Sequence, residues 1–339
     1  MADLYSTDVL IRVVRDLKVT PQFLLDTFFP IVQTEQSEEI HFDVENRTRR
    51  LAPFVSPVVA GQVVVSEGFE TKTFRPAYIK DKRVLDSSRP FKRSIGERIG
   101  GELSPMERQM RILGDELRDQ INMINRRLEV MAAEALRTGA VTVSGEQYPT
   151  RNVDFQRDAA LTVTLTGTAL WSDPASKPLN DLAAWSNMIL KKEGVGARTV
   201  VMDPDAFQAF LENNQVQSYL DNRRIRQREM LAQNLDVEGG RYEYSFGGID
   251  IYQYGGWYVD SAGVEQPILP SGTVLVSTPA LEGVRAFGAI RDEEAGFQAL
   301  PYYSKSWVEK DPSVRYLLMQ SAPLVVPTRV NASLAATVL

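Results

Sequence analysis

The amino-acid sequence predicts an α+β fold, and three features carry this prediction. A long amphipathic helix spans about residues 105–137 and has a clear start and stop. Two strand-like segments, 60–65 and 71–79, precede this helix as a hairpin. Helical and strand patterns then alternate through residues 172–290, and further apolar strands follow. The 339 residues provide for about two domains.

The composition excludes several kinds of active site. Cysteine is absent and histidine occurs once, at His41, so the chain has no disulfide, no thiol nucleophile and no Cys/His zinc site. His41 lies on the polar face of a predicted strand, residues 39–44, without a neighbouring serine and acid. This favours a surface histidine over a catalytic one. We therefore expect neither an enzyme nor a cofactor.

The charge and the hydropathy pattern restrict the partners. A net charge of −6 argues against holding nucleic acid by overall charge. The start of the chain, MADLYSTDVL, lacks the basic and apolar regions of a signal peptide. No apolar run approaches the ~18–20 residues that span a bilayer. We expect a soluble chain that is made in a cytoplasm and has no membrane partner.

The segments before the long helix contain apolar surface without an evident core. An amphipathic helix is expected from about Ser6 to Leu17. An apolar cluster that looks exposed follows Pro21: Phe23, Leu24, Leu25, Phe28 and Phe29. The hairpin of 60–65 and 71–79 also has little apolar sequence around it. Because an isolated hairpin is marginal in water, it folds onto its own domain or lies on another subunit, and the residues leave both open.

The long helix has the strongest local signals in the chain. Ser104 and Glu107 flank a proline in a capping box, and a glycine at 139 marks the stop. Its main apolar stripe consists of Met110, Leu113, Leu117, Ile121, Ile124, Leu128, Met131 and Ala135. Ile112, Met123 and Val130 form a second line, at spacings of 11 and 7. Either another body covers this second line, or the three residues are scattered exposed side chains.

The remainder alternates helices and strands and contains no catalytic constellation. Helices are expected at 178–192 and from Asp203-Pro204 to about 213, with strands at 199–202, 241–254, 256–260, 273–277 and 284–290. The acidic run 292–294 is more typical of a solvated loop than of a metal site. The arginines at 223–228 could contact DNA phosphate, acids of a neighbouring subunit or solvent, and we favour the last two.

Short segments distributed along nearly the whole chain resemble one known family. They are FVSPVVAG (54–61), TFRPAYIK (73–80), VMDP (201–204), DPSVR (311–315) and MQSAPL (319–324). Their order and spacing resemble the phage lambda major capsid protein family. The order of elements is similar to the Hong Kong 97-type fold of tailed-phage capsid proteins.

The resemblance implies a division of the chain into five parts. These are an N-terminal arm (1–50), an E-loop hairpin region (51–95), a P-domain (96–171) with the spine helix 105–137, an A-domain (172–300) and C-terminal strands (301–339) that return to both domains. In this family the E-loop reaches over a neighbouring subunit, which the resemblance assigns here to Val58, Val63, Val65, Phe69, Thr73, Phe74 and Arg75. The second line of the spine helix, Ile112, Met123 and Val130, is expected to face a neighbour. The A-domain tip or inner surface would present Arg223, Arg224, Arg226 and Arg228.

The function implied by the resemblance is shell building. Copies would assemble into hexamers and pentamers of an icosahedral head that encloses double-stranded DNA without sequence-specific binding. The expected partners are the chain itself, a scaffold, a portal and a decoration protein. The expected location is the virion, and the host cytoplasm during assembly.

Three alternatives remain open at this stage. An encapsulin-like nanocompartment shares the fold class and would enclose an enzyme instead of DNA. A hydrolase that uses paired acids would be active as a monomer. A tail or adhesion protein is usually an all-β trimer, and the long capped helix counts against that class.

Overall fold

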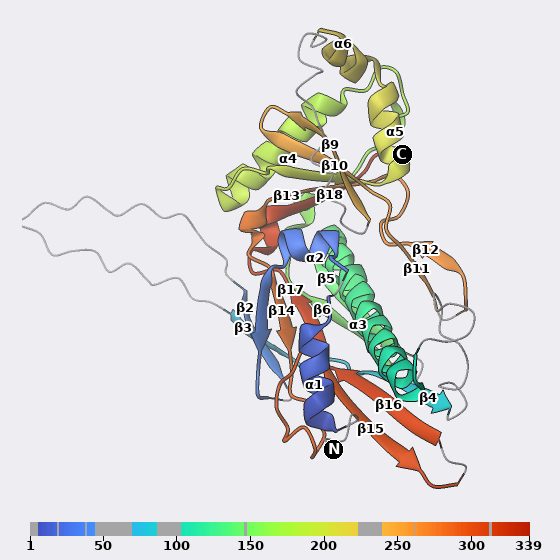
Figure 1. Cartoon of the computed structure of the whole chain (residues 1–339). Coiled ribbons are helices and arrows are strands. Elements are labelled where there is room, and N and C mark those ends of the chain that lie inside the picture. The colour runs from blue at the N-terminus through green and yellow to red at the C-terminus, as the bar shows by residue number, and fades with distance from the viewer. Residues whose placement is uncertain are drawn as a thin grey trace, which may run out of the picture.

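The computed structural model describes residues 6–18, 20–37, 39–44, 70–86, 103–145, 148–222, 239–260, 262–311 and 314–339. Helix α3 (Pro105–Thr138) is the longest element of this part of the chain. It runs obliquely below one group of helices and strands and alongside a second group of strands (Figure 1). The mixture of helices and strands confirms the α+β prediction.

The ends of α3 lie where the sequence places them. The Ser104 N–H donates to Glu107 Oε2 at 2.7 Å, and the Glu107 N–H donates to Ser104 Oγ at 3.3 Å. At the other end Gly139 adopts a φ of 71°, and Arg157 donates to the carbonyls of Leu136 and Arg137. Both ends thus pair backbone groups that a helix leaves unsatisfied. Every member of the predicted main stripe is buried except Met110, which is 47% exposed.

The upper group in Figure 1 is a six-stranded sheet with helices on it. The strand order is β7 (Thr162–Thr164), β18 (Ser333–Thr337), β13 (Thr273–Ser277), β8 (Thr199–Met202), β10 (Ile249–Tyr254) and β9 (Gly240–Phe246). The helices are α4 (Pro178–Glu193), α5 (Pro204–Glu212) and α6 (Asn214–Asn222). Trp171, Trp185 and Phe210 pack together in its separate core. A two-stranded ribbon, β11 (Trp257–Val259) with β12 (Glu265–Pro267), extends from this unit toward α3.

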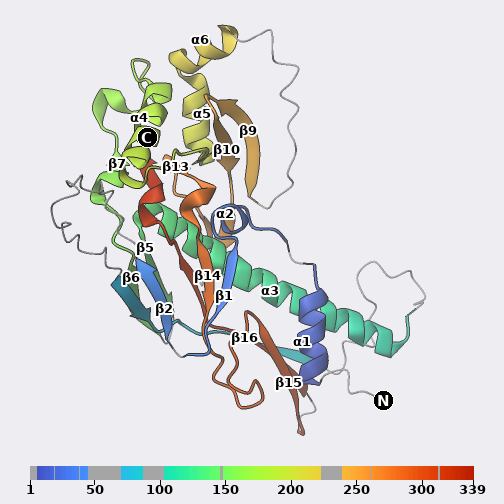
Figure 2. The same cartoon turned by 90° about the vertical axis from the view of Figure 1, so that its left-hand side faces the viewer.

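The lower group consists of small sheets packed beside α3. One sheet has the order β1 (Ile31–Thr34), β14 (Val284–Phe287) and β17 (Pro323–Val326), and Figure 2 shows β1 beside β14. The other pairings are β15 (Tyr303–Glu309), β16 (Val314–Ser321) and β4 (Ile79–Asp86); β2 (Ile40–Val44) and β3 (Glu70–Phe74); and β5 (Ala140–Gly145) and β6 (Tyr148–Asp154). Short 3₁₀ turns lie at Ala159–Leu161, Gly167–Ala169, Pro279–Leu281 and Val330–Ala332. The predicted strand 284–290 therefore lies in the lower group, away from the six-stranded sheet.

The prediction that the N-terminal apolar cluster is exposed is wrong. Helices α1 (Thr7–Asp16) and α2 (Phe23–Phe28) both pack on α3, and the five apolar side chains of the cluster are buried. Two glycines allow the rings of Phe23 and Phe29 to lie close to the backbone of other segments. A Cβ on Gly240 would lie 2.4 Å from the ring of Phe23, and one on Gly283 would lie 2.2 Å from the ring of Phe29. The cluster is part of the core of its own chain.

The predicted single strand 71–79 is also wrong. Strand β3 ends at Phe74 and pairs with β2, whereas β4 begins at Ile79 and pairs with β16. Pro76 lies between them, where a residue without an N–H cannot continue a ladder. The other predicted hairpin strand, 60–65, lies outside the described residues.

Candidate subunit interface

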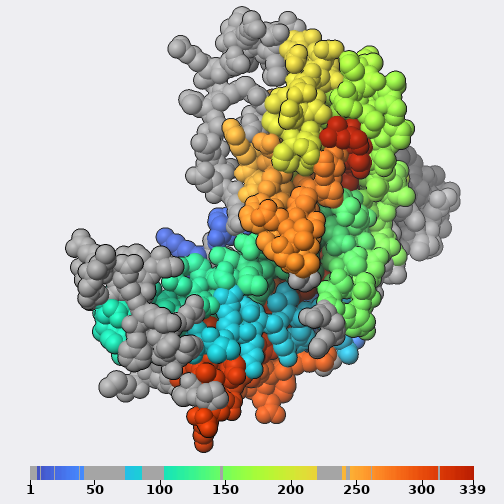
Figure 3. All heavy atoms as spheres, turned by 90° about the vertical axis from the view of Figure 1, so that its right-hand side faces the viewer, coloured from blue at the N-terminus to red at the C-terminus, as the bar shows by residue number. Residues whose placement is uncertain are grey.

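A groove of about 500 Å³ runs between α3 and the β11–β12 ribbon. Met123 and Val130 of α3 form one wall, and Trp257, Val259 and Ile268 contribute to the other. In Figure 3 the green surface of α3 meets the orange surface of the ribbon on this face. Met123 is 48% exposed and Trp257 is 57% exposed. Large apolar side chains gathered in one exposed groove are typical of a surface that binds a protein.

Charged side chains border this groove. Arg126 and Arg127 line it from α3, together with Asp119. Asp119 pairs with Arg83 at 2.7 Å, and Arg83 also pairs with Glu116 at 2.7 Å. Arg83 therefore fastens β4 to α3 beside the groove. An apolar centre with a charged border is the usual anatomy of a protein interface.

A second hollow, of about 260 Å³, adjoins the first across α3. It is lined by Tyr78, Val143 and Pro323 from three different strands or their ends, and Arg127 and Val130 line both hollows. Val130 therefore lies on a ridge between two depressions. A neighbouring chain could engage both with one extended segment.

The predicted second line of α3 is divided by the structure. Met123 and Val130 lie in the groove, but Ile112 is half-buried and packs against the main core of its own chain. Thr73, Phe74 and Arg75 also contact their own chain. Thr73 Oγ1 is 3.0 Å from His41 Nδ1, Phe74 packs against the main core, and Arg75 lies 3.9 Å from Glu39.

The remaining predicted interface residues lie outside the described residues. They are Val58, Val63, Val65 and Phe69 of the E-loop, and Arg223, Arg224, Arg226 and Arg228. His41 is exposed and its imidazole contacts Thr73, in agreement with a surface histidine.

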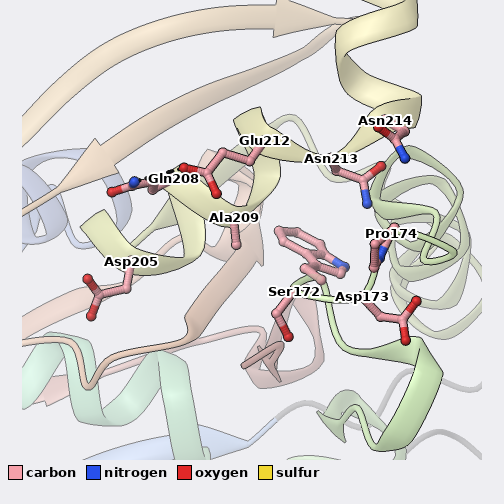
Figure 4. Close-up of a pocket in the computed structure, with 10 residues that line it drawn as sticks. Ser172, Asp173, Pro174, Asp205, Gln208, Ala209, Glu212, Asn213 and Asn214 are labelled. Atoms are coloured by element: carbon pink, nitrogen blue, oxygen red, sulfur yellow. Dashed lines mark hydrogen bonds between the residues drawn. The ribbon is translucent and has the colours of Figure 1, made fainter.

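Asp292, Asp173 and Asp205 each pair with groups of their own chain. Asp292 pairs with Lys305 at 2.5 Å and accepts from Gln320 at 3.1 Å. A hollow of about 420 Å³ is lined by residues of α5 and of the segment 171–174. Figure 4 shows Asp173 and Asp205 at its opposite ends. Asp173 accepts from the Ala175 N–H, and Asp205 accepts from the Ser271 hydroxyl. The residues that the structure describes contain no cluster of acids or histidines able to hold a metal ion, and no helix suited to span a membrane.

The most unusual group, Glu129, was not found by reasoning from the sequence. Its side chain is fully buried in the middle of α3. Its Oε1 accepts from the Leu24 N–H at 2.8 Å and the Tyr254 hydroxyl at 2.9 Å, and its Oε2 accepts from the Leu25 N–H at 2.9 Å. Burial raises the pKa of Glu129 to about 7, although the three hydrogen bonds lower it. The sequence does contain a signal for a buried acid at this position. Glu129 shares one helix face with residues 132, 133 and 136, and these three are apolar.

Comparison with known proteins agrees with a role in a shell. The family model of phage major capsid protein E matches residues 6–338. The major capsid protein of Escherichia phage lambda is 29% identical over 317 residues, covering 91% of each chain. That of Escherichia phage N15 is 29% identical over 331 residues, covering 95% of each chain.

A solved structure shows the fold. The crystal structure of a prophage capsid protein of Escherichia coli CFT073 superposes with a TM-score of 0.73 at 23% identity, covering 98% of this chain and 99% of that one. The Hong Kong 97-type fold of tailed-phage capsids is thereby confirmed. The curated relatives are structural proteins, which confirms the prediction that the chain is a structural protein and not an enzyme. The chain belongs to the phage major capsid protein E family.

Proposed function

We propose that the chain assembles with copies of itself into hexamers and pentamers, and that these form an icosahedral head around double-stranded DNA. The observation that carries this proposal is the exposed apolar groove on α3, because a subunit that works alone has no use for it. Membership of a capsid protein family supports the same reading. Scaffold, portal and decoration proteins are the expected partners, and the host cytoplasm is the expected place of assembly.

The occupant of the groove is proposed to be the E-loop of a neighbouring copy. The segment between β2 and β3 in the sequence, 45–69, is rich in apolar residues, among them Val58, Val63, Val65 and Phe69. It also contains Glu67, which can pair with Arg126 or Arg127 at the border of the groove. The wall residues Met123 and Val130 are the two members of the predicted second line that remain available.

The test is negative-stain electron microscopy of the purified chain, with analytical sedimentation of the same sample. Closed shells or six- and five-membered rings are the expected result. If the chain remains monomeric alone, the measurement is repeated with its scaffold protein. A chain that stays monomeric with scaffold present contradicts the proposal.

A pair of variants tests the proposed contact between the groove and the E-loop. Phe69→Ala in the E-loop and Met123→Ala in the groove should weaken assembly, and the double variant should be no weaker than the stronger single effect if both residues share one contact. Additive effects would place them in separate contacts and contradict the proposed occupant.

A further inference from the structure

The carboxylate of Glu129 joins three parts of the subunit. It belongs to α3, it accepts two backbone N–H groups of α2, and it accepts the hydroxyl of Tyr254 at the end of β10. Within the described residues no cation forms an ion pair with it. All three donors bind the same buried carboxylate. Its two oxygens therefore connect α2, α3 and the six-stranded sheet.

Helix α2 depends on this acid for its first turn. The residue before the helix, Gln22, makes no side-chain capping bond. Leu24 and Leu25 therefore receive their acceptors from Glu129, which is more than a hundred residues away in sequence. A helix of six residues is not stable by itself, so α2 depends on acceptors outside the helix. Without Glu129, two buried N–H groups lose their partners.

The third donor is held as firmly as the first two. The ring of Tyr254 is buried. A Cβ on Gly239 would lie 2.8 Å from this ring, and one on Gly256 would lie 2.5 Å from its hydroxyl oxygen. The ring of Phe23 packs against those of Tyr252 and Tyr254, with centroids 5.0 and 6.0 Å apart. A shift of β10 therefore moves an aromatic ring that touches the start of α2.

We propose that Glu129 is a coupling joint, through which the docking of the N-terminal helices and the attachment of the six-stranded sheet to α3 depend on one another. Loosening either attachment loosens the other. The joint exists within one subunit, so its test does not depend on whether the chain forms a shell. It goes beyond shell building by naming the point where a subunit would change the relative position of its parts.

The joint is also expected to respond to pH. The titratable groups that act on it are Asp26 of α2, whose charge raises the pKa of Glu129, and Tyr254 of β10, whose hydroxyl donates to it. Arg285 is paired with Asp26 at 2.5 Å. Burial raises the pKa of Glu129 to about 7, above that of an exposed glutamate, so the closed joint binds a proton more tightly than an open one. The contacts of Glu129 with α2 and β10 are therefore most stable at pH values below 4.5, the pKa of an exposed glutamate. They weaken as pH rises through about 7.

Hydrogen–deuterium exchange of the full, unassembled chain tests the coupling. Tyr254→Phe removes only the donor on the sheet, yet it should speed exchange of the α2 amides about tenfold. Tyr258→Phe is the matched control, because Tyr258 lies four residues along, beside the groove, and is half-buried. If Tyr254→Phe alters exchange only within residues 239–260, the two attachments are independent and the proposal is wrong.

The reciprocal test uses the acid. Glu129→Gln should lower the protection factors of the amides in both α2 and β10 and remove the change of these factors between pH 4.5 and about 7. Glu134→Gln on the same helix should do neither. Protection of β8 reports that the variants are folded. Should Glu129→Gln fail to fold, the Tyr254→Phe measurement across pH decides. Protection factors of the α2 amides that fall as pH rises support the joint, and protection factors that are independent of pH contradict it.

Discussion

Met123→Ala offers a sharp test of the groove because the same helix supplies a matched control. Met123 is 48% exposed and lines the groove, whereas Met110 is 47% exposed and does not. Complete burial of a methionine side chain is worth about 1.5–3 kcal/mol. A neighbour that covers the exposed half of Met123 therefore gains about 1 kcal/mol. In a ring with about six such contacts the loss accumulates to about 6 kcal/mol.

The assay is the protein concentration at which assemblies form, measured by light scattering and sedimentation. Met123→Ala should raise this threshold about fivefold, since about 1 kcal/mol per contact corresponds to that factor. Met110→Ala should leave it unchanged. Met123 Sδ also accepts from Arg83 at 3.1 Å, so Met123→Ala should unfold at a slightly lower temperature than Met110→Ala, and the thresholds are compared at a temperature where both variants are folded. Equal assembly thresholds for the two variants would refute the assignment of the groove.

The remaining predictions concern the subunit. Ser104→Ala removes the cap of α3 and should cost about 1 kcal/mol, seen as a lower melting temperature in calorimetry; an unchanged one contradicts the role of the cap. Gly114→Ala, where a Cβ meets nothing within 4 Å, should stabilise by about 0.5–1 kcal/mol in urea denaturation. Leu117→Ala, fully buried, should destabilise by about 2–5 kcal/mol in the same assay. Because burial raises the pKa of Glu129 from 4.5 to about 7, the free energy of unfolding should fall as pH rises between these two values and then level off, and Glu129→Gln should flatten that slope.

Much of the local structure could be predicted because its causes are local. The limits of α3 depend on Ser104, Glu107 and Gly139, which lie within or next to the helix. The helices after Pro178 and Pro204 and the strands Thr199–Met202 and Thr273–Ser277 likewise follow from short patterns. Such signals do not depend on what the element later contacts.

The sheet order could not be predicted from such patterns. Strands β7 and β18 are neighbours, although more than 160 residues separate them in the sequence. Strand β1 pairs in parallel with β14 while its side chains stay exposed, and the preceding helix α2 packs on α3, far along the chain. The same long-range contact explains the error about the N-terminal cluster: apolar side chains with no nearby partner look exposed when their partner is far along the chain.

The second line of α3 shows why burial must be judged turn by turn on a long helix. Ile112, Met123 and Val130 lie on one line, but the helix is about 50 Å long, and its neighbours change along that length. The main core covers Ile112, whereas the ribbon stands away from the helix near Met123 and leaves a groove. The second wall of that groove, Trp257 and Val259, comes from a strand that no pattern in the helix could reveal. A helix pattern can thus indicate that a second partner exists, but the neighbouring elements decide which turns are left for it.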